Sequence, residues 1–169
     1  ASQAQALLAD AVAGEPSNQR WRQALVDRQA FALLTALQAG TAAEIEACAT
    51  VLSTTLASTS TSPTAIVRYL QTLHAVRALA PDEAIAQLDA ALALPADWTP
   101  SSRRPRYSEL RARAAVQIER LRLGSEHRRP MSARACETAV AFWSPVMRSG
   151  VAGPIPKLWR QLEDACRAS

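Results

Sequence analysis

An all-α fold is what the composition and the spacing of helix-breaking residues predict for this chain. Alanine, the best helix former, supplies 36 of the 169 residues, while glycine contributes 5 and aromatic residues 5%. β-Strands favour branched and aromatic side chains, which are scarce here. A length of 169 residues and an apolar fraction of 49% suit one ordinary domain. We therefore expect a single-domain helical bundle of about eight helices over residues 1–169.

The first two helices are bounded by glycine and by polar caps. Residues 2–13 form a short apolar helix that ends at Gly14. Ser17 or Asn18 can cap the next helix, which runs to about residue 39 and stops at Gly40. Its apolar side chains recur near the helical period of 3.6 residues and predict a buried stripe of Trp21, Leu25, Phe31, Leu34 and Leu37.

A capping box marks the start of the third helix. Thr41 precedes Glu44 by three residues, the spacing at which the two side chains can cap each other's backbone. The serine- and threonine-rich run 53–62 then predicts a polar loop, and residues 57–62 are the candidate sub-boundary within the domain.

Prolines open the next two helices. Pro63 begins a helix that extends to about Ala80, and Pro81 begins another, with Asp82 and Glu83 near its positive end. Three further helices follow the irregular stretch 95–105. We place them at 106–123, broken by Gly124, at 131–148, where Pro145 introduces a kink or an early end, and at 155–167.

Residues 63–98 resemble one helical hairpin of the tetratricopeptide repeat family. In its second helix, small, bulky and small residues and then a proline follow one another, as Ala84, Leu88, Ala91 and Pro95 do here. The first helix departs from the family pattern, with Thr72 where a glycine is usual and Ala75 where an aromatic residue is usual, and no second copy is visible. The resemblance implies solenoid-like antiparallel hairpins and a protein-binding scaffold. Its groove residues would be Arg68, Gln71, His74 and Arg77.

The basic residues gather in one segment. Residues 101–130 carry nine arginines and three glutamates, a net charge of +6 in a chain whose net charge is +4. Two clusters bracket a helix and could bind a nucleic acid or another polyanion: Arg103, Arg104 and Arg106, and Arg128 and Arg129. A GC-rich bacterial genome, which enriches alanine and arginine together, also explains this composition.

The helix between these clusters has a predicted apolar stripe of Tyr107, Leu110, Ala114, Ile118 and Leu121. Arg113 and Arg120 lie beside this stripe on the helical wheel. We expect their heads to reach solvent while their stems cover the edge of the core.

The chain offers no catalytic, cofactor-binding or metal-ligating motif. His74 and His127 are the two histidines, and neither lies in a recognised arrangement with a nucleophile. The cysteines Cys48, Cys136 and Cys166 have no metal-ligand spacing, so we expect three free thiols. One disulfide with one free thiol is the alternative if the protein is exported.

These observations predict a non-catalytic helical protein that binds a macromolecule, as an adaptor, a chaperone-like factor or a structural subunit of a complex. Binding of a polyanion or nucleic acid through 101–130 is the alternative. No apolar run is long enough to span a membrane, which favours the cytoplasm slightly. Because the chain starts at Ala1, a mature exported or periplasmic protein is also compatible with the sequence.

Overall fold

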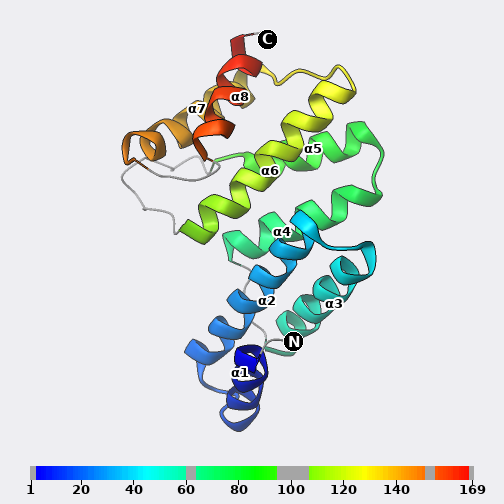
Figure 1. The fold of residues 1–169 in the computed structure, drawn as a ribbon, viewed down its shortest axis with the longest axis vertical. Helices are drawn as coiled ribbons and strands as arrows, with labels where there is room; N and C mark the ends of the chain where they lie inside the picture. Colours follow the sequence, from blue (N-terminus) through cyan, green and yellow to red (C-terminus); the bar gives the residue numbers. More distant parts are fainter. Residues whose placement is uncertain (1–2, 60–63, 95–106, 151–154, 168–169) are drawn as a thin grey trace. The chain divides into compact units, whose positions relative to one another are not determined.

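The computed structural model describes residues 3–59, 64–94, 107–150 and 155–167, and within them the fold is all-α. Eight α-helices and one short 3₁₀ turn make up these residues, and no strand occurs among them (Figure 1). The chain divides into two compact units, Ala1–His74 and Ala75–Ser169. Of the candidate sub-boundary at 57–62, residues 57–59 belong to the third helix, and residues 60–62 lie outside the described residues. No helix in the described ranges combines the length and apolarity that a membrane crossing requires.

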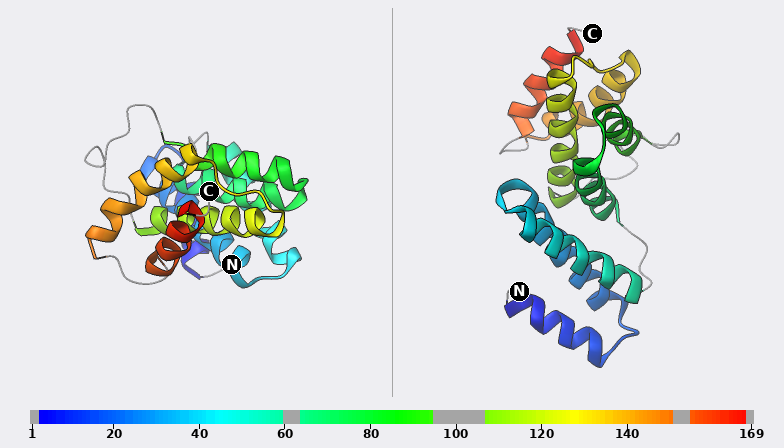
Figure 2. Two further views of the ribbon diagram at one scale, coloured as in Figure 1. Left: turned by 90° about the horizontal axis from the view of Figure 1, so that it is seen from above. Right: turned by 90° about the vertical axis from the view of Figure 1, so that its right-hand side faces the viewer.

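The first unit holds α1 (Gln3–Gly14), α2 (Gln19–Ala39), α3 (Ala42–Thr59) and most of α4 (Ala65–Ala75). The helices α2 and α3 lie side by side in opposite directions, and α1 packs against α2 (Figures 1 and 2). Side chains from α2 and α3 form the core of this unit; they include Leu25, Val26, Ala30, Leu33, Leu34, Ile45 and Leu52.

The ends of α2 and α3 are capped as the sequence predicts. The Asn18 side chain accepts a hydrogen bond of 3.3 Å from the Trp21 backbone N–H, and the Gly40 N–H donates to the Ala36 carbonyl at 2.7 Å. At α3 the Thr41 N–H donates to Glu44 Oε2 at 2.7 Å, while the Glu44 N–H donates to Thr41 Oγ1 at 3.3 Å. Both halves of the capping box are therefore present.

Two expectations for the first unit are wrong. The helix α3 continues to Thr59, so residues 53–59 are helical rather than a loop, since serine and threonine can return hydrogen bonds to the preceding turn. The buried face of α2 is also rotated from the predicted stripe. Leu25 and Leu34 are buried as predicted, but Trp21 and Phe31 are 37% and 46% exposed, and Val26, Ala30 and Leu33 are buried as well.

The second unit holds the 3₁₀ turn η1 (Val76–Ala78), α5 (Pro81–Leu92), α6 (Tyr107–Glu126), α7 (Ala133–Arg148) and α8 (Ile155–Arg167). Pro81 begins α5, with Asp82 and Glu83 in its first turn, as expected. The helix α6 packs against α5 and α8, and α7 packs against α8 and α5 (Figure 1). Pro145 neither shortens α7 nor ends it, because the helix continues to Arg148.

The core of the second unit is formed by α6, α7 and α8 around a fully buried Trp143. Its other members include Leu110, Ala114, Met131, Phe142, Val146, Ile155, Leu158 and Leu162. A disulfide between Cys136 and Cys166 joins α7 to α8 across this core, and Cys48 is free. The expectation of three free thiols is thus wrong, because the fold brings two distant cysteines to a Cα–Cα separation of 5.6 Å.

The helix α6 departs most from its predicted face. Gly124 does not break the helix, and Tyr107 and Ile118 are exposed. Arg113 and Arg120, expected to reach solvent, are each 2% exposed. Arg113 stacks over the Phe142 ring, 4.0 Å from its centre, and donates to the Leu92 carbonyl. Because helices pack on both sides of α6, the guanidinium groups of Arg113 and Arg120 interact with groups inside the second unit instead of with water.

Candidate binding site between α5, α6 and α7

The four residues implied by the repeat resemblance do not all fall in one unit. Arg68 and Gln71 are exposed on α4, and His74 ends the first unit. The His74 ring lies 2.9 Å from Glu46 of α3. Arg77 is exposed in η1, in the second unit. A role for these residues in binding a partner stays a prediction.

The structure describes two of the five candidate polyanion-binding arginines; Arg103, Arg104 and Arg106 lie outside the described residues. The exposed Arg129 is already occupied, since its guanidinium donates to both Asp82 carboxylate oxygens, at 3.0 and 3.3 Å. Arg128 is exposed and forms no ion pair within the described ranges. Of these two guanidinium groups, only that of Arg128 has no carboxylate partner among the described residues, so it is the one available to bind an anion.

The structure places three of the residues considered for catalysis in separate surroundings. His127 is exposed, Cys136 is held in the disulfide, and His74 is paired with Glu46. Within the described ranges, no three histidine, cysteine or acidic side chains come together as metal ligands would.

A pocket lies instead within the second unit, where the end of α5, the middle of α6 and the start of α7 meet. The volume of this pocket is about 160 Å³. The pocket is lined by Asp89, Leu92, Ala93, Gln117, Met131, Ser132, Arg134, Ala135, Thr138 and Ala139, and apolar atoms provide most of its surface.

Gln117 of α6 is the buried polar group of this pocket. The residue is 1% exposed, and its Oε1 has no hydrogen-bond partner among the described residues. Its Nε2 donates only to the thioether of Met131, at 3.7 Å. Sulfur is a weak acceptor, so neither end of this amide forms a strong hydrogen bond. Leaving such a group unsatisfied costs about 1–3 kcal/mol.

Arg120 fixes the segment between α6 and α7 that forms one side of the pocket. Its Nε donates to Asp89 Oδ1 at 2.7 Å, and its two terminal nitrogens donate to the carbonyls of Arg129 and Pro130 at 3.2 and 3.3 Å. Gly124 permits this close approach, because a Cβ at that position would lie 2.7 Å from the Arg129 carbonyl oxygen. The charge of Asp89 is therefore balanced inside the unit.

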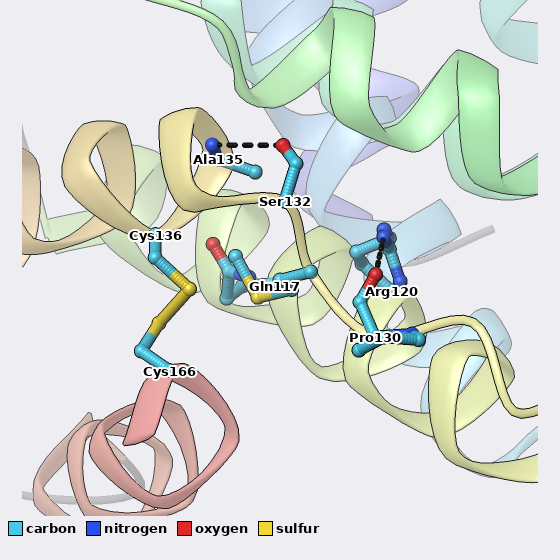
Figure 3. Close-up of a disulfide and its surroundings, with 8 residues drawn as sticks. Gln117, Arg120, Pro130, Ser132, Ala135, Cys136 and Cys166 are labelled. Carbon is cyan, nitrogen blue, oxygen red and sulfur yellow. Dashed lines mark hydrogen bonds between the residues drawn. A yellow bond between two sulfur atoms is a disulfide. The ribbon is translucent and has the colours of Figure 1, made fainter. Parts of the chain in front are cut away.

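The start of α7 forms the other side. Ser132 caps the helix by accepting a hydrogen bond of 3.2 Å from the Ala135 N–H. Figure 3 shows Gln117 between the Cys136–Cys166 disulfide and the Arg120–Pro130 contact, with the Ser132–Ala135 turn above it, and Cys136 belongs to the same first turn of α7. The disulfide and the Arg120 hydrogen bonds thus hold the two sides of the pocket.

An unpaired positive charge lies at the mouth of the pocket. Arg134 is exposed in the first turn of α7 and forms no ion pair among the described residues. The N-terminal end of a helix carries partial positive charge and unpaired backbone N–H groups. Because Asp89 is neutralised by Arg120, the mouth attracts anions more than cations.

The sequence analysis missed this site. The sequence does contain a pattern that indicates it. Arg113, Gln117 and Arg120 recur at spacings of four and three, which places three long polar side chains on one face of α6. That face was treated as the border of an apolar stripe, although polar residues in register on a helix can also form a buried polar network.

Comparison of the chain with models of known protein families, with curated proteins and with solved structures finds no match to any of them. The chemistry of the site therefore carries the functional argument.

Proposed function

We propose that this protein is a non-catalytic helical module that binds another protein, as an adaptor, a chaperone-like factor or a structural subunit, and that the pocket receives part of its partner. The observation that carries this proposal is Gln117, a buried amide with no strong hydrogen bond in the wall of an otherwise apolar pocket. A buried amide without a strong hydrogen bond destabilises the folded protein. A partner residue that hydrogen-bonds to Gln117 on binding would remove this cost.

The surface of the first unit supports a protein partner. The helix α1 contains no buried residue, and Leu7 on it is 63% exposed. Asp10 is its single charged residue. Exposed apolar surface of this kind is typical of interfaces between proteins, and it gives a polyanion nothing to bind.

The test compares two tryptophan substitutions, one on α5 and one at Ala93, the residue that directly follows this helix. Ala93 is exposed at the pocket, whereas Ala90 is exposed on α5 and does not line the pocket. We expect immobilised protein to capture one partner from extracts of its native cells, with little dependence on salt. Ala93→Trp should abolish the capture and Ala90→Trp should retain it. Equal capture by both variants would show that the partner does not bind in the pocket.

Binding of a polyanion is the second candidate, and the exposed charge of Arg128 is the observation that favours it. This candidate predicts retention on heparin that collapses between low and moderate salt, because released counterions drive such binding. Arg128→Ala should then elute at lower salt than the unchanged protein, while Ala93→Trp should elute with it. No retention at low salt would dismiss the candidate.

We also propose that the protein works in an oxidising compartment, as an exported or periplasmic chain does. The Cys136–Cys166 disulfide supports this, because structural disulfides persist where thiols are not kept reduced. Alkylation of the protein from its native cells without prior reduction should modify Cys48 under denaturing conditions and leave the other two cysteines unmodified. Modification of all three would place the chain in a reducing compartment.

A further inference from the structure

The pocket also shows which chemical group its occupant brings. Each end of the Gln117 amide has one need: Oε1 lacks a donor, and Nε2 has only the Met131 sulfur. A group that answers both needs on one edge carries a donor and an acceptor side by side. A primary carboxamide does this, and two carboxamides can pair through two hydrogen bonds.

The shape and lining of the pocket suit a carboxamide on a short apolar stem. Leu92, Met131, Ala135 and Ala139 offer an apolar wall on the way to Gln117. The Met131 thioether occupies Gln117 Nε2, so an incoming carbonyl must displace it there, and methionine side chains rearrange readily. Gln117 Oε1 is out of contact with solvent, so it becomes accessible only when the side chains around it move. The hydroxyl groups of Ser132 and Thr138 can satisfy the remaining polar atoms of the incoming amide.

The charge at the mouth indicates what flanks this group. Arg134 and the first turn of α7 provide positive charge that no carboxylate of the described pocket lining balances, since Asp89 is engaged by Arg120 at 2.7 Å. An acidic residue next to the carboxamide side chain would place its charge there.

From these observations we propose that the pocket recognises a glutamine or asparagine side chain of a partner peptide with acidic flanking residues, by pairing its carboxamide with that of Gln117. This inference rests on the proposed function, because it takes the occupant to be a protein segment. Neither methionine nor glutamate can replace it: a methionine cannot pair with the amide, and a glutamate carboxylate has no N–H to donate to Gln117 Oε1.

The experiment uses capped tripeptides and the full chain. Titrations of ¹⁵N-labelled protein with aspartate–glutamine–aspartate, and with its methionine- and glutamate-centred analogues, are followed through the Gln117 side-chain resonance and the backbone resonances of Ala135 and Ala139. We expect saturable shifts, with the glutamine peptide bound about tenfold more tightly than either analogue, a difference of about 1.4 kcal/mol. Equal affinities, no shifts at the pocket, or tighter binding of free glutamine than of the peptide would overturn the inference.

Gln117→Met tests the pairing directly. It keeps the length of the side chain and removes the amide, so the preference for the glutamine peptide over the methionine peptide should disappear. Should this variant fail to fold, Ala93→Trp, a change at an exposed position, should abolish binding of all three peptides. Persisting preference in Gln117→Met, or unchanged binding in Ala93→Trp, contradicts the proposal.

Arg134→Ala tests the acidic flank, with Arg160→Ala as the matched control. Arg160 is also exposed on a helix of the second unit, but it lies outside the pocket. We expect Arg134→Ala to weaken binding several-fold and Arg160→Ala to leave it unchanged. Equal effects of the two variants would show that the flanking charge is not read at the pocket.

The outcomes separate this inference from the proposed function. If Ala93→Trp abolishes partner capture but the tripeptides bind without selectivity, the result supports protein binding at the pocket and contradicts recognition of a carboxamide by Gln117. If the glutamine peptide binds selectively while capture ignores the pocket, the chemistry of the pocket stands and its use in partner binding falls.

Discussion

Two arginines of α6 form buried contacts that their positions in the sequence do not predict. Arg113 and Arg120 are buried, with one head stacked on Phe142 and the other bonded to three oxygens. On a helical wheel both border the apolar stripe, where arginines usually reach solvent. Whether a head points outward or inward depends on neighbouring helices, so only the tertiary structure reveals these contacts.

Replacing Arg120 by methionine should destabilise the protein by about 3 kcal/mol, because the Asp89 carboxylate and two backbone carbonyls lose their donor. Arg122→Met is the matched control. The Arg122 guanidinium pairs with Glu119 and Glu126 at an exposed position, and those carboxylates raise its pKa. Exposed pairs contribute about 1 kcal/mol or less. Urea unfolding measures both, and similar losses would mean that Arg120 is not a cross-link.

Arg128 occupies a conformation that favours glycine. Its φ is 53°, and the turn around it has the hydrogen bonds of a Schellman motif, from the Arg129 N–H to the Gly124 carbonyl at 2.7 Å and from the Arg128 N–H to the Ser125 carbonyl at 3.4 Å. The left-handed region costs a residue with a Cβ about 1–2 kcal/mol.

Arg128→Gly should therefore raise the free energy of unfolding by about 0.5–1 kcal/mol, after the greater freedom of glycine in the unfolded chain is subtracted. Thermal unfolding checks this. Arg128→Ala, which removes the charge and keeps the Cβ, should give no such gain, and an equal gain from both would attribute the effect to charge.

Capping sets the boundaries of the helices more reliably than the apolar pattern sets their faces. Asn18, Gly40 and the Thr41–Glu44 box act as the sequence indicates, because a cap bonds to backbone within three or four residues. The predicted faces of α2 and α6 were less accurate. A face depends on which helices pack around it, and those contacts join residues distant in sequence.

The Glu44 carboxylate gives α3 a dependence on pH. The hydrogen bonds from the Thr41 backbone and hydroxyl lower the pKa of Glu44 below its usual value of 4.5. Because the folded pKa is the lower one, the stabilisation is complete above the unfolded pKa and is lost as pH falls through the folded pKa.

Compared with Glu44→Gln, the unchanged protein should thus be more stable at neutral pH, and this advantage should shrink as pH falls past the usual glutamate pKa of 4.5 and vanish below the lowered folded pKa. Urea unfolding from pH 2 to pH 7 measures it, and an NMR titration of Glu44 gives the folded pKa. An advantage independent of pH would indicate that the carboxylate charge is not what the cap uses.

At the scale of the whole molecule, the chain divides into a unit of α1–α4 and a unit of α5–α8, and the covalent link belongs to the second. The Cys136–Cys166 bond spans 30 residues of sequence and joins α7 to α8. Closing a loop of that length restricts the unfolded chain by about 3–4 kcal/mol on the chain-entropy estimate.

Reduction should accordingly lower the free energy of unfolding by about 3 kcal/mol, and the Cys136→Ser/Cys166→Ser double variant should behave like the reduced protein. Cys48→Ser serves as the control and should leave stability within about 0.5 kcal/mol. Calorimetry with and without reductant measures the loss. An unchanged transition on reduction would show that the disulfide does not hold the second unit.

Composition and hydrogen bonds between residues close in the chain were enough to predict the helical class, about eight helices, both caps of α2 and the N-terminal cap of α3. The tertiary structure alone decided the disulfide, the inward heads of Arg113 and Arg120, and the pocket around Gln117. Each of these needs groups far apart in sequence to meet, and their meeting is set by the packing of α5, α6, α7 and α8, which no local pattern encodes.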